Sequence, residues 1–287
     1  MVSRHDNLTE TMTSQPLDQT ASAWGATAPN YDLFAEQVTR SFADDGTRLV
    51  RIAEGTRVLD VAAGTGNFSF SAARRGANVL ATDFARGMLD VLERKAREQG
   101  VDSRIETRVM DGQALTIADG SFDVVGSIFG LLFFPDKDLG IREMHRVLVP
   151  GGRAVISTWA PPPRGEMSRI LGLAMRAAFP DMLPPSAPQH WTELGEADEF
   201  RERLIANGFA RAHVVEVRHV WVFDRIERFT ESIPKVSPPM VAMFESMNAG
   251  QRRVFLDTIA NDFQVRQGDG PYAITHEALI AIATKAA

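Results

Sequence analysis

Hydrophobic positions follow two spacings in the middle of the chain, between residues 57 and 159. Short apolar or alternating runs without a helical period predict β-strands, because β-branched residues fit a pleated, half-buried surface. These runs cover residues 57–61, 78–82, 104–110, 121–128 and 153–159. Apolar residues at helical spacing lie between them and predict helices from Asn67 onwards, up to about Gln99, and over 138–148. Strands and helices therefore alternate along this segment.

The N-terminal part of the chain has a different pattern. Residues 1–20 are polar without an apolar period, which predicts a flexible tail. Residues 21–55 are expected to form a helical arm on a single domain that extends to residue 287. The amphipathic part of this arm, 32–52, has a predicted buried face made of Phe34, Val38, Phe42, Leu49 and Ile52.

The C-terminal part combines helical inserts with two further strand patterns. Consecutive prolines and helically spaced Met and Leu residues predict a lid insert near 160–195, and a second insert is expected near 225–248. Residues 212–223 predict a strand, and 273–283 fit a closing strand although their alanines also permit a helix. Further helices are predicted over 196–207 and 251–263.

A glycine-rich turn follows the first predicted strand, in the sequence Arg57–Gly66, RVLDVAAGTG. Strand, glycine turn and helix together direct backbone N–H groups at a ligand, although such turns also occur for purely structural reasons. A dinucleotide site would have a third glycine where Ser69 stands. Asp60 would repel a pyrophosphate but suits a ligand with positive charge. S-adenosylmethionine, which has a sulfonium and an ammonium group, fits that requirement.

The segment from Arg57 to Trp159 resembles the class I S-adenosylmethionine-dependent methyltransferases that act on small molecules. VLDVAAGTG is similar to the first motif of that family, and TDFARGML is similar to the second. The resemblance implies an α/β fold with a doubly wound, seven-stranded, mostly parallel Rossmann-like sheet and helical lid insertions. It also implies that S-adenosylmethionine is the cofactor.

The resemblance assigns a cofactor site to the ends of the predicted strands. Asp83 would accept hydrogen bonds from the ribose, although an N-cap role competes. Phe84 and Met88 would flank the adenine unless they are core residues, and Asp111 would accept from the adenine amino group unless it is a solvated turn residue. The remaining cofactor-binding candidates are Asp60, Ala62, Gly64, Gly66, Gly112, Gln113, Ser127 and Tyr31.

The acceptor is expected between the arm and the lid. The apolar loop 129–134 and the insert 160–195 follow strands that are neighbours in the family, so both should border one hydrophobic pocket. The candidate residues of this pocket are Trp24, Phe129, Phe133, Met175, His190 and Trp191. His190 and then Tyr31 are the candidate catalytic residues, while His145, His213 and His219 are expected to be structural or exposed.

Composition restricts the partners. The formal net charge is −6 and no dense Lys/Arg stripe is present, which argues against nucleic acid. The chain has no cysteine, no signal-like N-terminus and no long apolar segment, so we expect no thiolate metal site, no membrane partner and a cytoplasmic monomer or homodimer.

The expected reaction is methyl transfer to oxygen, nitrogen or sulfur of a small aromatic or heterocyclic acceptor. Carbon methylation of a quinone-like or polyketide acceptor is the alternative. Three other classes stay open: a nucleotide-binding oxidoreductase, a cofactor-binding protein without catalysis, and a methyltransferase that modifies macromolecules. A basic or extended groove would favour the last class.

Overall fold

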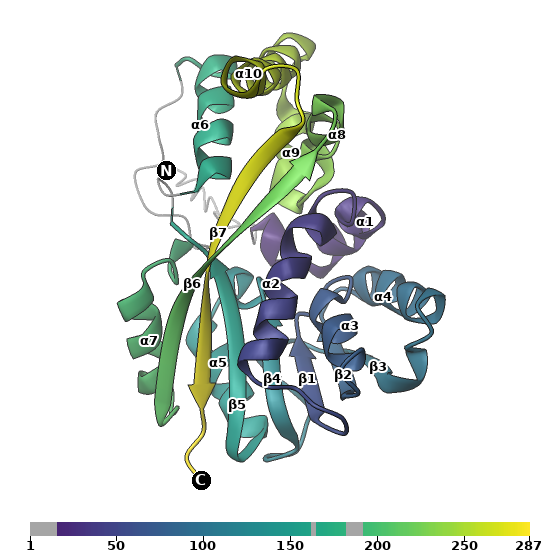
Figure 1. Cartoon of the computed structure of the whole chain (residues 1–287), viewed down its shortest axis with the longest axis vertical. Helices are drawn as coiled ribbons and strands as arrows, with labels where there is room; N and C mark the ends of the chain where they lie inside the picture. The colour runs from purple at the N-terminus through teal and green to yellow at the C-terminus, as the bar shows by residue number, and fades with distance from the viewer. Residues whose placement is uncertain (1–15, 162–164, 182–191) are drawn as a thin grey trace, which may run out of the picture.

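The computed structural model describes residues 16–161, 165–181 and 192–287, and its centre is a seven-stranded sheet with the order β3-β2-β1-β4-β5-β7-β6 (Figure 1). β1 to β5 are parallel, and β7 lies antiparallel between β5 and β6. The order reverses between β1 and β4, which confirms the doubly wound topology. The strands are β1 (Arg57–Val61), β2 (Asn78–Asp83), β3 (Ile105–Val109), β4 (Phe122–Ile128), β5 (Leu148–Trp159), β6 (Arg211–Phe223) and β7 (Tyr272–Thr284).

Helices cover both faces of the sheet because successive strand residues point to opposite sides. Val58, Val124 and Val155 pack with Phe42 and Phe68 on one side, while Leu59, Val125 and Ile156 pack with Ile141 and Leu204 on the other. The described α-helices are α1 (Ala21–Tyr31), α2 (Ala35–Leu49), α3 (Asn67–Ala73), α4 (Arg86–Glu98), α5 (Lys137–Val147), α6 (Glu166–Ala178), α7 (Ala197–Ala206), α8 (Ile226–Thr230), α9 (Pro238–Ser246) and α10 (Ala249–Gln267).

A two-stranded ribbon of β6 and β7 extends beyond the rest of the sheet. β5 pairs with β7 up to Trp159, which lies opposite Ala278. Residues 272–277 of β7 continue past this point and pair with residues 218–223 of β6. The ribbon ends among α6, α8 and α10 (Figure 1), where Trp221, Phe229, Phe255 and Phe263 form a second hydrophobic cluster. The helices of both predicted insert ranges therefore lie beyond the carboxyl end of β5.

Two local predictions differ from the structure. Leu49 was expected in the buried face of the arm but is 38% exposed, because α2 ends there. β5 begins at Leu148, and the residues expected to separate it from α5, Val149–Gly152, lie within it as a bulge where the register with β4 shifts. Residues 272–284 form the closing strand that was expected over 273–283, because alternate side chains contact the cores on the two faces of the sheet.

No helix in the described ranges is long and apolar enough to span a membrane. Within the same residues, no three His, Asp or Glu side chains gather as a possible metal-ligand set.

Candidate active site

A cavity of about 160 Å³ lies at the carboxyl ends of β1, β2 and β4, beside the point where the strand order reverses. Open α/β sheets bind their ligands at this position. The turn from β1 to α3 forms one wall, and its backbone has left-handed φ angles at Ala62 (54°), Gly64 (56°) and Gly66 (99°). A strained conformation at Ala62 is of the kind that clusters at binding sites.

Asp60 lies on the floor of this cavity and is 1% exposed. Its Oδ2 accepts hydrogen bonds from the Ser69 backbone N–H at 3.0 Å and from the Ser69 hydroxyl at 2.6 Å. Burial raises the pKa of Asp60 to about 7, while the two bonds from Ser69 act in the opposite direction. The sequence analysis considered Ser69 only as a missing glycine, yet its hydroxyl holds the Asp60 carboxylate that lines the cavity.

Asp83 lies at the end of β2 and is also buried. It accepts from the Gly64 backbone N–H at 2.9 Å and from the Ala85 backbone N–H at 2.9 Å. Burial raises the pKa of Asp83 to about 6, and these backbone bonds partly offset that effect. Asp83 therefore fixes the glycine turn while its carboxylate lines the cavity.

The glycines of the site differ in what a side chain would meet. A Cβ at Gly64 would have no heavy atom within 4 Å, so the space above this residue is open. A Cβ at Gly66 would lie 2.7 Å from Leu92, and one at Gly112 would lie 2.4 Å from Phe134. An open backbone cradle at Gly64 beside two carboxylates fits an adenosyl group with hydroxyls and a positive charge.

The residues expected around the adenine lie along one side of the cavity. Phe84 and Met88 line it, and both also pack in the small cluster around Trp24. Asp111 is exposed and accepts from the Gln113 backbone N–H at 2.8 Å. The Gln113 side-chain oxygen accepts from the Asp136 backbone N–H at 2.9 Å, which ties the loop after β3 to the loop after β4.

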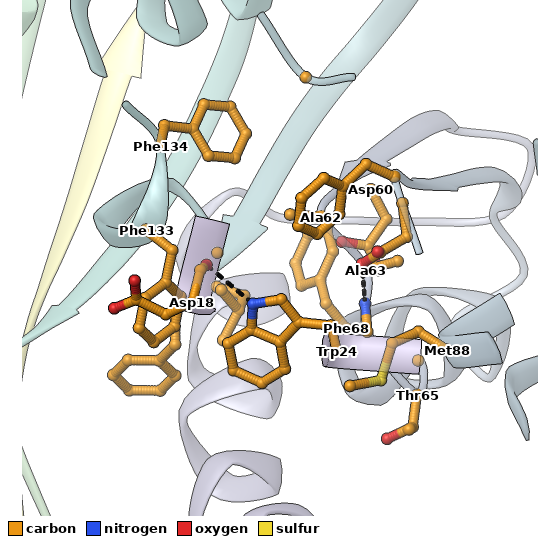
Figure 2. A pocket seen from close by; sticks show the side chains of 18 of the residues that line it. Asp18, Trp24, Asp60, Ala62, Ala63, Thr65, Phe68, Met88, Phe133 and Phe134 are labelled. Carbon is orange, nitrogen blue, oxygen red and sulfur yellow. Dashed lines mark hydrogen bonds between the residues drawn. The ribbon is translucent and has the colours of Figure 1, made fainter. Parts of the chain in front are cut away.

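The N-terminal arm contributes Asp18, Trp24 and Tyr31 to the lining of the cavity, and Figure 2 shows Trp24 between Phe133 and Met88. The Trp24 ring is 8% exposed, and its indole N–H donates to the Asp18 carbonyl at 2.8 Å. Trp24 contacts Phe133 edge-to-face with ring centroids 5.1 Å apart, and Tyr31 at 6.0 Å. Trp24, Tyr31 and Phe133 all line the cavity; the sequence predicted Tyr31 at the cofactor, but Trp24 and Phe133 in the acceptor pocket.

An ion-pair network holds the junction of α1 and α2 against the glycine turn. The Lys95 ammonium lies 2.9 Å from Asp32 and 3.4 Å from Glu36, and the Thr65 hydroxyl donates to Asp32 at 2.5 Å. Burial strongly raises the pKa of the Tyr31 phenol, and the negative charges of Asp32 and Asp83 raise it further. Tyr31 therefore stays protonated at neutral pH and can act as a hydrogen-bond donor.

The loop after β4 brings Phe129 into the cavity with a left-handed φ of 58°. Its backbone N–H donates to the Ser157 hydroxyl at 3.0 Å, and its ring stacks on Trp159 at 3.8 Å. Ser127 does not line the cavity: its hydroxyl accepts from the Leu131 backbone N–H at 3.1 Å and so shapes the loop. Sequence reasoning did not single out Trp159, although it is the last residue of β5.

The other acceptor and histidine candidates lie away from this cavity or outside the described residues. Met175 lies in α6 and packs against the cluster around the ribbon end. His190 and Trp191 are outside the described residues, so their assignments stay predictions. His145 packs edge-to-face on Phe209, and His219 Nε2 lies 2.7 Å from Asp45 Oδ2.

Comparisons with known proteins agree with this geometry. A family model described as a methyltransferase domain matches residues 58–152. A demethylmenaquinone methyltransferase from Thermus thermophilus is 38% identical over 165 residues, which cover 55% of this chain and 71% of the relative. A second one, from Deinococcus radiodurans, is 33% identical over 223 residues, which cover 69% of this chain and 89% of the relative.

Solved structures show the same fold. A structure titled as a putative methyltransferase from Bacillus halodurans aligns with a TM-score of 0.56 and 17% identity, over 86% of this chain and 100% of the other. Sequence motifs, fold, cavity and relatives therefore agree. The chain belongs to the class I S-adenosylmethionine-dependent methyltransferases, and S-adenosylmethionine is its cofactor.

Proposed function

We propose that the chain methylates a ring carbon of a small hydroquinone-type aromatic acceptor. From the sequence we expected methylation of oxygen, nitrogen or sulfur, with methylation of carbon as the alternative. The two relatives are named for methylation of demethylmenaquinone, which favours the alternative. The aromatic character of the expected acceptor is unchanged.

The observation that carries the proposal is the aromatic wall beside the cofactor cavity. Phe129 stacks on Trp159 with an interplanar angle of 17°, and Phe42 contacts both rings edge-to-face. Phe42 is fully buried behind this stack, whereas Trp159 is half-buried and Phe129 lines the cavity. We propose that these two rings are the part of the wall on which a flat apolar acceptor packs. An acidic acceptor or a nucleic acid would instead need a cluster of positive charge there.

Bound S-adenosylmethionine supplies a methyl group on a sulfonium, which is already a strong electrophile. The protein has to align the acceptor and exclude water. Trp24 and Phe133 close the cofactor cavity, while Asp60 and Asp83 supply negative charge on its floor. The acceptor carbon gains the methyl group and loses one proton, and the sulfonium becomes a neutral thioether.

Proton removal has two candidates from the sequence. Tyr31 is protonated at neutral pH, so we propose that it donates a hydrogen bond and does not act as a base. His190 stays a candidate base by prediction.

The test incubates the purified protein anaerobically with S-adenosylmethionine and naphthohydroquinone, which is prepared by chemical reduction of naphthoquinone. The expected product carries one new methyl group on a ring carbon, identified by its NMR signal. A methoxy product would overturn carbon methylation and would favour methylation of oxygen. If no methyl group is transferred while S-adenosylhomocysteine binds normally, the acceptor class is wrong.

A further inference from the structure

The side chain of Asn67 connects the glycine turn with α2. Asn67 is the first residue of α3, directly after Gly66, and α3 lies beside α2 (Figure 1). Its Nδ2 donates to the Thr39 hydroxyl at 2.8 Å and to the Glu36 carbonyl at 3.4 Å. Asn67 and Thr39 both line the cofactor cavity. The amide is therefore part of the cavity wall.

The neighbours of this amide determine which way it faces. The Thr39 hydroxyl donates to the Ala35 carbonyl at 2.8 Å, so it can only accept from Asn67. The Glu36 carbonyl oxygen also only accepts. Two acceptors on one side require the amide nitrogen there, which leaves Oδ1 on the side away from α2.

Asn67 Oδ1 is an accessible hydrogen-bond acceptor. Asn67 is half-buried, and no described residue donates to its Oδ1. The buried side-chain atoms that lack a partner in the described ranges are Thr158 Oγ1 and His276 Nε2, and Asn67 Oδ1 is not among them. A ligand in the cavity can therefore reach this oxygen.

Asn67 lies between the glycine turn and the aromatic wall. Its partner Thr39 is three residues from Phe42 in α2, so both side chains share one face of that helix. Phe42 contacts Phe129 and Trp159 edge-to-face, and Phe129 lines the same cavity as Asn67. The cavity wall thus continues from the glycine turn through Asn67 towards the rings on which we propose that the acceptor packs.

The charges around the cavity favour different ligands at its two sides. Asp32 and Glu36, the acids at the start of α2, are engaged with Lys95 at 2.9 Å and 3.4 Å. Asp60 and Asp83 lie on the cavity floor, at the ends of β1 and β2. Those carboxylates suit the positive groups of the cofactor, whereas a neutral amide oxygen suits a neutral hydroxyl group.

An amide oxygen distinguishes the two redox forms of a quinone. It can only accept a hydrogen bond. A hydroquinone offers an O–H donor, whereas the carbonyl oxygens of the oxidised quinone only accept and would leave Asn67 Oδ1 unpaired. The hydroquinone is also the form whose ring carbon is electron-rich enough to attack the methyl group of the sulfonium.

We infer, on the basis of the proposed function, that Asn67 Oδ1 accepts a hydrogen bond from a ring hydroxyl of the acceptor and thereby selects the hydroquinone over the quinone. Asn67 is then a binding residue that determines specificity. Thr39 is a positioning residue, because its hydroxyl keeps the amide nitrogen on the side of α2.

The experiment compares Asn67→Leu and Thr39→Val with the wild type. Asn67→Leu removes the polar atoms at nearly constant shape, whereas Thr39→Val keeps the amide and removes the hydroxyl that orients it. Asn261→Leu is the matched control, since Asn261 is an exposed asparagine of α10. Anaerobic calorimetry in the presence of S-adenosylhomocysteine measures binding of naphthohydroquinone and of naphthoquinone, which meets no cysteine in this chain. Steady-state kinetics measures KM and kcat for naphthohydroquinone.

We expect the wild type to bind naphthohydroquinone about tenfold more tightly than naphthoquinone, the scale of one hydrogen bond. Asn67→Leu should lose this preference and raise the KM for naphthohydroquinone by a similar factor, while affinity for S-adenosylhomocysteine stays the same. Thr39→Val should narrow the preference by strengthening naphthoquinone binding, because the released amide can turn Nδ2 towards a quinone carbonyl. Asn261→Leu should match the wild type.

The outcomes separate this inference from the proposed function. If the preference for naphthohydroquinone depends on Asn67 but no ring carbon is methylated, the proposed reaction fails and the role of Asn67 stands. If a ring carbon is methylated and Asn67→Leu changes neither KM nor the preference, the inference fails. It also fails if Asn67→Leu mainly weakens S-adenosylhomocysteine binding, because the oxygen then accepts from the ammonium group of the cofactor. Should Asn67→Leu not fold, an unchanged preference in Thr39→Val would overturn the inference.

Discussion

Asp60 and Asp83 are two carboxylates buried on the floor of one cavity, and each has a pKa above its usual range. Two such groups close together cost free energy when both are ionised and no cation is near. We expect the sulfonium and ammonium groups of the cofactor to supply that positive charge. Binding of S-adenosylmethionine would then favour the ionised form of both acids.

This linkage predicts a pH-dependent affinity. A bound cation favours the ionised carboxylates and lowers their pKa, so binding releases protons near and below pH 7. Affinity for S-adenosylmethionine should rise from about pH 5.5 to about pH 7.5 and then level off, because the free-state pKa values are about 7 and about 6. Calorimetry in two buffers of different ionisation enthalpy measures the release. An affinity that falls over this range would contradict the linkage.

Asp83 should contribute directly to cofactor affinity. Asp83→Ala is expected to weaken S-adenosylmethionine binding by about 1–3 kcal/mol, the usual effect of losing hydrogen bonds to a charged group. Asp102→Ala, an exposed aspartate in a short helical turn, is the control. Unchanged affinity in a folded Asp83→Ala protein would remove Asp83 from the ribose role.

At the scale of elements, α1 crosses α4 through two glycines. A Cβ at Gly87 would lie 2.9 Å from the Gly25 Cα and carbonyl oxygen, whereas a Cβ at Gly25 would lie 3.9 Å from the Gly87 nitrogen. The close approach allows Trp24 to reach the cavity from α1. The contact is thus asymmetric, although both residues are glycines within helices.

The asymmetry predicts opposite effects of two matched substitutions. Gly87→Ala should displace α1 and weaken cofactor binding, since overpacking typically costs about 1–3 kcal/mol. Gly25→Ala should be neutral or stabilise the protein by up to about 1 kcal/mol, because alanine favours the helix. Urea unfolding and calorimetry with S-adenosylhomocysteine provide both measurements. Equal effects would show that the crossing is not tightly packed.

Deletion of the N-terminal arm tests whether turnover depends on enclosing the active site. Deletion of residues 1–32 takes away Trp24, Tyr31 and the Asp32 partner of Lys95. Turnover of the acceptor should collapse while circular dichroism still shows a folded α/β core. Methylation at the full rate by the truncated protein would mean that Trp24 and Tyr31 are only anchors.

Element prediction from sequence was accurate where the signal is local. All seven strands, including β7 at the C-terminus, lie within a few residues of their expected positions. The errors concern tertiary context: Pro150 and two glycines read as a break, yet the pairing of Leu148 with Phe122 keeps them inside β5. For β7 the expected strand is confirmed, and the packing of its alanines on both faces of the sheet excludes the helix that they also permitted.

Across the whole molecule, the two halves of the active site differ in how far sequence predicts them. The cofactor half follows short motifs, and its Asp, Gly and Phe residues line one cavity as expected. The aromatic wall proposed for the acceptor combines α2, the loop after β4 and β5, which are distant in sequence. Trp159 carries no motif, so only the packing of Phe42 and Phe129 on it brings the wall together.

Cofactor binding should stabilise the whole domain. S-adenosylhomocysteine at about one hundred times its dissociation constant should add about 2.7 kcal/mol to the free energy of unfolding. For a chain of this size, we expect a rise of roughly 5–10 °C in the thermal midpoint. Scanning calorimetry measures it, with NADH as the control ligand. A comparable rise with NADH would contradict the assignment of the cofactor.

Trp24 covers the cofactor cavity and is held by Asp18, Phe133 and the crossing of α1 with α4. We expect that a molecule in that cavity exchanges with solvent when this helix moves aside. Binding of S-adenosylmethionine and release of S-adenosylhomocysteine would therefore depend on the same movement of α1, which is separate from the chemical step. The residence time of the by-product is then set by how firmly the arm is docked, and an arm variant would change the turnover number without touching the acceptor.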